Sequence, residues 1–184
     1  MLTKLYFYTA VLLFAPTVIF AAEFPIIKAV DGDSIEIGER RIRLDGIDAP
    51  EFNQICYDYA NKEYLCGKSA LRFLENLLKN KDIQCSCLAQ KDKYKREICE
   101  CFADGISINQ VMVSSGWATA YRSDKYIDDE IYAQKSRIGI WQGKHMRPAL
   151  FRILSNYKKQ THQKTDFNHA KISVAETLCK TSSK

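Results

Sequence analysis

The order of hydrophobic and polar positions predicts an α+β domain. Short apolar or alternating runs predict strands over residues 24–30, 34–37 and 41–44, and again over 83–88 and 98–102. Apolar positions at helical spacing predict helices over 67–79, 106–115 and 128–138. Gly116 and Gly139 follow the last two, as residues that end helices often do. Strands, one inserted helix, two further strands and then helices are typical of an α+β fold.

The N-terminus has the pattern of a secretory signal. Lys4 precedes an apolar run from Leu5 to Phe20, and Ala21 and Ala22 follow it. We interpret residues 1–22 as a signal peptide. An uncleaved membrane anchor is the alternative, although the run of 16 residues falls short of the roughly 20 that span a bilayer. Either reading places the remainder in an oxidising compartment, so we expect a secreted or periplasmic protein.

The positive charge is concentrated at the C-terminus. The formal net charge is +5, yet residues 23–151 carry 19 basic and 20 acidic side chains, while residues 152–184 carry 7 basic and 2 acidic ones. Any binding of a polyanion must therefore come from local clusters and from the tail. We interpret residues 23–153 as one folded domain and residues 154–184 as a basic, mostly disordered tail.

The cysteine pattern agrees with export. All seven cysteines follow the predicted signal. Cys56 and Cys66 bracket a polar, tyrosine-rich segment that we expect to be a surface loop closed by a disulfide. Cys179 lies in the tail, where it is a free thiol or an intermolecular bridge.

Four cysteines lie on two predicted strands that a charged turn joins. One hairpin register places them directly opposite each other in two pairs, Cys85 with Cys101 and Cys87 with Cys99. Two cross-strand disulfides are our first interpretation. A structural zinc ion, or one disulfide with two packed thiols, are the alternatives.

Carboxylates and arginines recur in three short segments that folding alone does not explain. Residues 31–33 form an Asp-Gly-Asp turn, residues 43–51 combine Arg43 with three acids, and residues 92–96 form a basic hairpin tip. Pro50 stiffens the backbone between Asp48 and Glu51. Carboxylate oxygens suit calcium or magnesium, and arginines suit the bidentate recognition of phosphate.

These segments, in this order and spacing, resemble the thermonuclease family, which includes staphylococcal nuclease. The resemblance runs from about residue 24 to residue 152, and the pattern of cysteines is similar to that of its exported bacterial branch. The matching pieces are residues 30–34, 43–51, 92–96, 116–121 and 137–141.

The resemblance implies a five-stranded OB-type β-barrel with about three helices, stapled here by disulfides, and calcium-dependent hydrolysis of phosphodiesters in DNA and RNA. It also implies roles for individual residues. Asp33, Asp48 and the carbonyl of Ala49 would bind calcium, near Asp31. Glu51 would be the general base, and Arg43 and Arg96 would stabilise the phosphate. Tyr94 and Tyr121 would contact the substrate.

The chemistry of the reaction supports this set independently. A phosphodiester is an anion that repels hydroxide, so its hydrolysis needs cations at the phosphate and a positioned base for water. The three histidines lie outside the clustered segments, which argues against histidine-based nucleases.

Lys95 departs from the family pattern, which has glycine there, so a positive φ would strain this turn and re-aim Arg96. Ala49 and Ser34 each replace threonine, with little expected effect.

Two other classes of function compete with a nuclease. An OB-type module could bind single strands without cutting them, through Trp117, Tyr121 and the tail. The four-cysteine hairpin could instead make this a metal or redox protein. Under the nuclease interpretation the partners are DNA and RNA substrates. Nothing in the sequence indicates a stable protein partner or an oligomer, so we expect a monomer.

Overall fold

The N-terminal strands form an antiparallel meander. We describe residues 25–161 of a computed structural model. The strands β1 (Ile27–Asp31), β2 (Ser34–Ile37) and β3 (Arg40–Leu44) pair in sequence order, which confirms the three predicted strands. Their buried side chains belong to one hydrophobic core. The tight turn between β1 and β2 brings Asp31 and Asp33 to one end of the meander.

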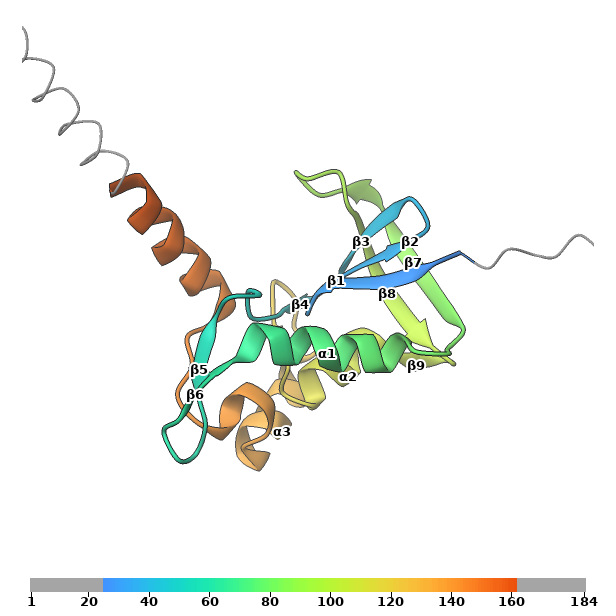
Figure 1. Ribbon diagram of the computed structural model, residues 1–184. Coiled ribbons are helices and arrows are strands. Elements are labelled where there is room, and N and C mark those ends of the chain that lie inside the picture. Colours follow the sequence, from blue (N-terminus) through green and yellow to red (C-terminus); the bar gives the residue numbers. More distant parts are fainter. Residues whose placement is uncertain (1–24, 162–184) are drawn as a thin grey trace, which may run out of the picture.

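A second hairpin completes a mixed sheet (Figure 1). The strands β7 (Ile83–Lys91) and β8 (Glu97–Ala103) pair antiparallel, and β8 runs parallel to β3, which gives the order β1-β2-β3-β8-β7. The short strand β9 (Ile106–Ser107) also pairs with β8, so this sheet has six strands rather than five. The tip of the β7–β8 hairpin projects from the body of the domain.

The predicted helices are present with shifted boundaries. Helix α1 (Cys66–Leu78) packs against β1 and buries its apolar face in the core. Helix α2 (Ile108–Ser114) begins two residues after the predicted start because Ser107 belongs to β9 and caps the helix, its hydroxyl accepting from the amide of Gln110. Helix α3 (Ile127–Ser136) leads into a 3₁₀ turn, η1 (Gly139–Gln142).

Two small strand pairs were not predicted. One joins β4 (Ile47–Asp48) to β10 (Thr119–Ala120), and the other joins β5 (Ile55–Tyr57) to β6 (Glu63–Leu65). Elements of two or three residues carry no detectable periodicity. The β4–β10 pair matters for the site because it holds Asp48 opposite Thr119, a residue far along the chain.

The disulfides follow the predicted pairing. Cys85 bonds to Cys101 and Cys87 to Cys99 across the β7–β8 ladder, and Cys56 in β5 bonds to Cys66, the first residue of α1. With all four hairpin cysteines in disulfides, neither a zinc-thiolate site nor a pair of free thiols is present there.

A further helix runs over residues 148–161 and was not anticipated. It extends away from the body of the domain (Figure 1) and takes in the first eight residues of the segment interpreted as a tail. The rest of that segment, with Cys179, and the predicted signal peptide lie outside the described residues. Within residues 25–161, no helix combines the length and the apolar character that crossing a lipid bilayer requires.

Candidate active site

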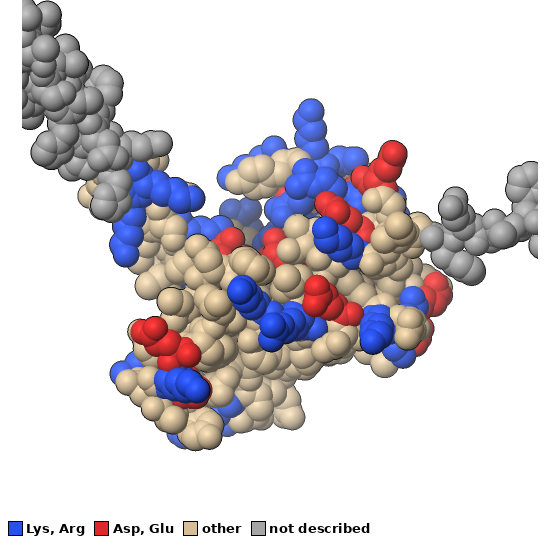
Figure 2. Space-filling model, viewed as in Figure 1, with Lys and Arg blue, Asp and Glu red and all other residues tan. Residues whose placement is uncertain are grey.

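The predicted site residues converge on one cleft of about 790 Å³. Seven of the eight line it, and Asp48 lies beneath its surface with 1% of its area exposed. The cleft separates the hairpin tip at residues 92–96 from the helix at residues 148–161 and is visible as a hollow in Figure 2. The lining residues predicted from sequence are Asp33, Arg43, Ala49, Glu51, Tyr94, Arg96 and Tyr121.

The turn between β1 and β2 positions Asp33 in the floor of this cleft. A Cβ atom on Gly32 would lie 2.6 Å from the Cβ of Ala49 and 2.8 Å from that of Ala70, so only glycine lets the turn press against α1 and the β4 segment. Asp33 Oδ1 accepts from the hydroxyl of Ser34 at 3.0 Å, and Oδ2 accepts from the amide of Ala49 at 3.2 Å. The carboxylate of Asp33 is thereby held in a fixed direction.

Arg43 bridges the two proposed metal ligands. Its Nη1 lies 2.7 Å from Asp33 Oδ1, and its Nη2 donates to Asp48 Oδ1 at 3.3 Å and to the carbonyl of Ile47 at 3.1 Å. One planar guanidinium therefore contacts both carboxylates, Asp33 in the lining of the cleft and Asp48 beneath its surface. Two of the five N–H donors of Arg43 remain for another anion.

Acidic and basic side chains line the cleft in similar numbers, and two of the acids at the cleft have raised pKa values. Burial, reinforced by the charge of Asp33, raises the pKa of Asp31 from 3.8 to about 6. Burial also raises the pKa of Asp48, even though Arg152 and Arg43 oppose the shift. A neighbouring carboxylate destabilises the charged form of a carboxylate, and a cation bound nearby stabilises that charged form.

Glu51 is held at the rim by the start of α1. A Cβ on Gly67 would lie 1.8 Å from the carbonyl oxygen of Glu51, so the absence of a side chain there permits this close approach. The amide of Glu51 donates to Oε1 of Gln54 at 3.3 Å, and Gln54 in turn donates to the carbonyl of Met146 at 2.6 Å. Gln54 is fully buried, which fixes the backbone from which Glu51 projects into the cleft.

Arg96 is positioned by the turn that precedes it. Its Nε donates to Asp92 Oδ2 at 2.8 Å, and its Nη1 donates to the hydroxyl of Ser34 at 2.9 Å. Although burial acts in the opposite direction, hydrogen bonds from Arg96 and Tyr94 hold the pKa of Asp92 below its usual value. Lys95 has a φ of +64°, as expected if lysine replaces a turn glycine, yet Arg96 still faces the cleft because Asp92 holds it.

The two tyrosines flank the cleft. Tyr94 is 59% exposed at the hairpin tip, with the guanidinium of Arg96 5.4 Å from its ring centre. Tyr121 follows β10, and its amide donates to the carbonyl of Gly46 at 2.9 Å. Aromatic faces beside guanidinium groups are suited to stacking on nucleobases.

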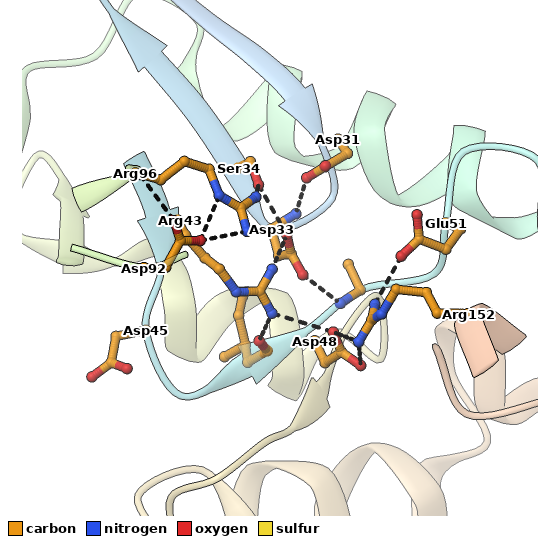
Figure 3. Close-up of polar contacts among 12 residues, drawn as sticks. Asp31, Asp33, Ser34, Arg43, Asp45, Asp48, Glu51, Asp92, Arg96 and Arg152 are labelled. Carbon is orange, nitrogen blue, oxygen red and sulfur yellow. Dashed lines mark hydrogen bonds and ion pairs between the residues drawn. The ribbon is translucent and has the colours of Figure 1, made fainter. Parts of the chain in front are cut away.

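Arg152 is the contact that sequence reasoning missed (Figure 3). It lies on the helix at residues 148–161, where its Nη2 donates to both carboxylate oxygens of Asp48 at 2.8 and 2.9 Å and its Nη1 donates to Glu51 Oε1 at 2.8 Å. A signal for this helix is present in the sequence. Pro148 suits a first helical position, and apolar residues recur at helical spacing, at Leu150, Ile153, Leu154 and Tyr157.

The contacts form one continuous chain of acids and arginines across the cleft (Figure 3). In order, it runs through Asp92, Arg96, Ser34, Asp33, Arg43, Asp48, Arg152 and Glu51. Each of these acids therefore contacts an arginine, and for Asp33, Asp48 and Glu51 at least one such arginine comes from a different element.

The donor set of the cleft fits calcium. Asp33 and Asp48, which both contact Arg43, offer hard oxygen ligands of the kind that calcium prefers, and Asp31, whose pKa is raised chiefly by burial, lines the same cleft. Among the described residues, the one group of three possible metal ligands within 4.8 Å is Cys87, Glu97 and Cys99. Two of these form a disulfide, so that group is not a metal site.

Comparisons with known proteins agree with the geometry. The family model described as staphylococcal nuclease homologue matches residues 41–143. The chain is 36% identical over 130 residues to the succinoglycan biosynthesis protein ExoI of Rhizobium meliloti (strain 1021), which covers 66% of this chain and 67% of that protein. It is 31% identical over 129 residues to an uncharacterized endonuclease of Haemophilus influenzae (strain ATCC 51907 / DSM 11121 / KW20 / Rd), which covers 63% of this chain and 64% of that protein.

Proposed function

Since this chain belongs to the family of staphylococcal nuclease homologues, we propose that it is a calcium-dependent nuclease that hydrolyses phosphodiester bonds in DNA and RNA. The observation that carries the proposal is the convergence of three separated segments on one cleft. They bring Asp33, Asp48 and Glu51 together with Arg43 and Arg96. The name of the Haemophilus relative, an endonuclease, supports the same class of activity.

The arginines bind the scissile phosphate. Asp33 and Asp48 orient Arg43, and Asp92 and Ser34 orient Arg96, while each guanidinium keeps two N–H groups for the substrate. The positive charge is therefore placed before the substrate arrives. Such preorganised donors stabilise the charge that develops on the phosphate oxygens in the transition state.

Glu51 takes the proton of the attacking water. Its side chain is 39% exposed, so water reaches its carboxylate from the cleft, and the buried Gln54 fixes its backbone. Asp33, Asp48 and the carbonyl of Ala49 would hold calcium. When bound, this ion neutralises charge on the phosphate and lowers the barrier to attack by an anionic nucleophile.

The remaining parts of the proposal concern fold, substrate and location. We propose that the strands β1, β2, β3, β8 and β7 correspond to the OB-type barrel of the family. Tyr94 and Tyr121 present aromatic faces, which stack on every base and so suit both DNA and RNA. Export through residues 1–22 is supported by the three disulfides, which persist in oxidising compartments.

Cleavage assays on the purified protein test the proposal. Plasmid, single-stranded DNA and RNA are incubated with calcium, with magnesium or with a chelator. We expect cutting with calcium that the chelator abolishes. Glu51→Gln should lower the rate about 100- to 10 000-fold, as expected for loss of a general base.

Glu75→Gln is the matched control for that variant. Glu75 is an exposed residue of α1 and does not line the cleft, so the same change of charge there should leave the rate unaltered. Unchanged cleavage by Glu51→Gln would refute the assignment of the base. Binding of single strands without any cleavage would instead support a nucleic-acid-binding module.

A further inference from the structure

The helix at residues 148–161 forms one wall of the cleft. The residues that it contributes are Ala149, Arg152, Ile153 and Asn156, which recur at the spacing of a single helical face. The opposite wall is the hairpin tip at residues 92–96. The helix therefore lies where substrate and metal must enter, although it follows the segment that the family model matches, residues 41–143.

Arg152 is paired with two of the acidic groups on which the proposed reaction depends. Its Nη2 donates hydrogen bonds to both carboxylate oxygens of Asp48, and its Nη1 donates one to a carboxylate oxygen of Glu51. Burial works against the charged guanidinium, yet the hydrogen bonds with Glu51 and Asp48 raise the pKa of Arg152 above its usual value. Charge-assisted, bidentate pairs of this kind are among the stronger polar contacts in proteins.

The helix has few other polar attachments to the domain. Within the described chain, no hydrogen bond or ion pair joins the side chains of residues 153–160 to the rest of the fold. Beyond its first turn, most of its apolar positions are open to solvent, with Ile153 64% and Tyr157 65% exposed. Arg152 is therefore the main polar link between this helix and the cleft.

A calcium ion and Arg152 cannot share Asp48 in this arrangement. Asp48 Oδ1 already accepts from Arg43 at 3.3 Å and from Arg152 at 2.8 Å, and Oδ2 accepts from Arg152 at 2.9 Å. Calcium bound to either oxygen would lie within a few ångströms of a guanidinium, and like charges at that distance in a partly buried cleft repel strongly. In the same arrangement, Oε1 of Glu51 is also occupied by Arg152.

We propose that Arg152 is an internal competitor of the metal ion, which closes the site through Asp48 and Glu51 and is displaced, together with its helix, when calcium binds. This rests on the proposed function, because it takes Asp48 as a calcium ligand and Glu51 as the base. Calcium binding and release of the helix are then thermodynamically coupled. Calcium must shift the release equilibrium by the same factor by which release of the helix changes the affinity for calcium.

Calorimetric titration of the full-length protein with calcium alone tests the competition. We expect Arg152→Gln to bind calcium about tenfold more tightly than the wild type, or tighter still. Arg147→Gln is the matched control. Arg147 precedes the same helix and pairs with Glu130 at 2.6 Å, but it does not line the cleft, so the affinity of this variant should match that of the wild type.

Hydrogen exchange distinguishes displacement of the helix at residues 148–161 from an effect of Arg152 on the charge of the cleft alone. In the wild type, calcium should increase the exchange of amides over residues 150–160. In Arg152→Gln these amides should exchange rapidly before calcium is added and should not respond to it. The helix of Arg147→Gln should respond as in the wild type.

The outcomes distinguish this inference from the proposed function. If wild type and Arg152→Gln bind calcium equally, or if calcium leaves the exchange of the helix unchanged, Arg152 is not a competitor, while the calcium-dependent nuclease stands. If neither protein binds calcium, both the proposed metal dependence and the competition are wrong.

Discussion

Asp92 and Arg96 are joined at three points, since the carboxylate of Asp92 accepts from the backbone amide of Arg96 at 2.9 Å and from its Nε at 2.8 Å, and lies 2.8 Å from its Nη2. The same carboxylate also accepts from the amide of Tyr94 at 2.9 Å. One acid therefore holds the turn and aims the arginine. This explains how the tip keeps Arg96 in the cleft although Lys95 adopts a conformation that favours glycine.

The strain at Lys95 predicts a stabilising substitution. Lys95→Gly should raise the free energy of unfolding by about 0.5–1 kcal/mol, because relief of the left-handed strain exceeds the added flexibility of the unfolded chain. Urea unfolding measures it. Lys93→Gly, in the same turn but without a positive φ, should destabilise the protein instead. Equal effects of the two variants would show that Lys95 is unstrained.

Tyr94 should contribute to substrate binding rather than to the chemical step. Because a base stacked on an aromatic ring is worth about 1–3 kcal/mol, Tyr94→Leu should raise KM for single-stranded DNA about 5- to 100-fold with little change in kcat. Tyr132→Leu is the control, since Tyr132 is similarly exposed at 60% but lies on α3, away from the cleft. A loss confined to kcat would contradict a stacking role.

His145 should make stability dependent on pH. Its ring packs edge-on against Trp141, with the ring centres 4.5 Å apart, and burial lowers its pKa below the ordinary value of 6.5. The unfolded chain then binds the proton more readily, so this contribution to stability is present above about pH 6.5 and is lost as the pH falls through the lowered value.

The variant His145→Phe removes this proton site and keeps a ring against Trp141. Urea unfolding at pH 7.5 and at pH 5 compares the two proteins, and groups common to both cancel in the difference. We expect the wild type to lose more stability than the variant on acidification. A difference that is the same at both pH values would show that His145 does not titrate between them.

The disulfide between Cys56 and Cys66 should stabilise a peripheral part of the fold. It joins β5 to the first residue of α1 and packs against Ile140 in a small second core. A cross-link that closes a loop of this size contributes about 2–4 kcal/mol. The double variant Cys56→Ala and Cys66→Ala should lose that amount in urea unfolding and keep the proposed calcium-dependent cleavage. Complete loss of cleavage would mean that this hairpin also shapes the cleft.

The elements predicted from sequence are those whose own residues specify them. The alternation along β1 to β3 and the apolar face of α1 follow from local pattern, and the facing cysteines fix the β7–β8 register. By contrast, β4 and β10 have two residues each and exist only because the rest of the fold brings them together. No local sequence pattern predicts such a pair of strands.

The convergence of the site residues was predicted to a similar extent, while their roles stay predictions. The acids and arginines of the three motifs lie together at one cleft, as their order and spacing in the sequence predicted, because tight turns and Pro50 restrict the backbone around them. Arg152 was placed at the end of the predicted domain, and its charge was counted with the C-terminal segment, without a role in the site. Its contact with Asp48 spans 104 positions. A contact of this kind depends on how a distant helix docks, which the sequence around either residue does not determine.

The alternating chain of acids and arginines from Asp92 to Glu51 means that these residues are not independent of one another. Replacing one member leaves its neighbours partly uncompensated, so the effects of two substitutions in the chain should not add. A charge lost at one position changes which replacements the next position tolerates. Variants of this site therefore have to be made and compared as sets, since the order in which substitutions accumulate determines which intermediates fold and function.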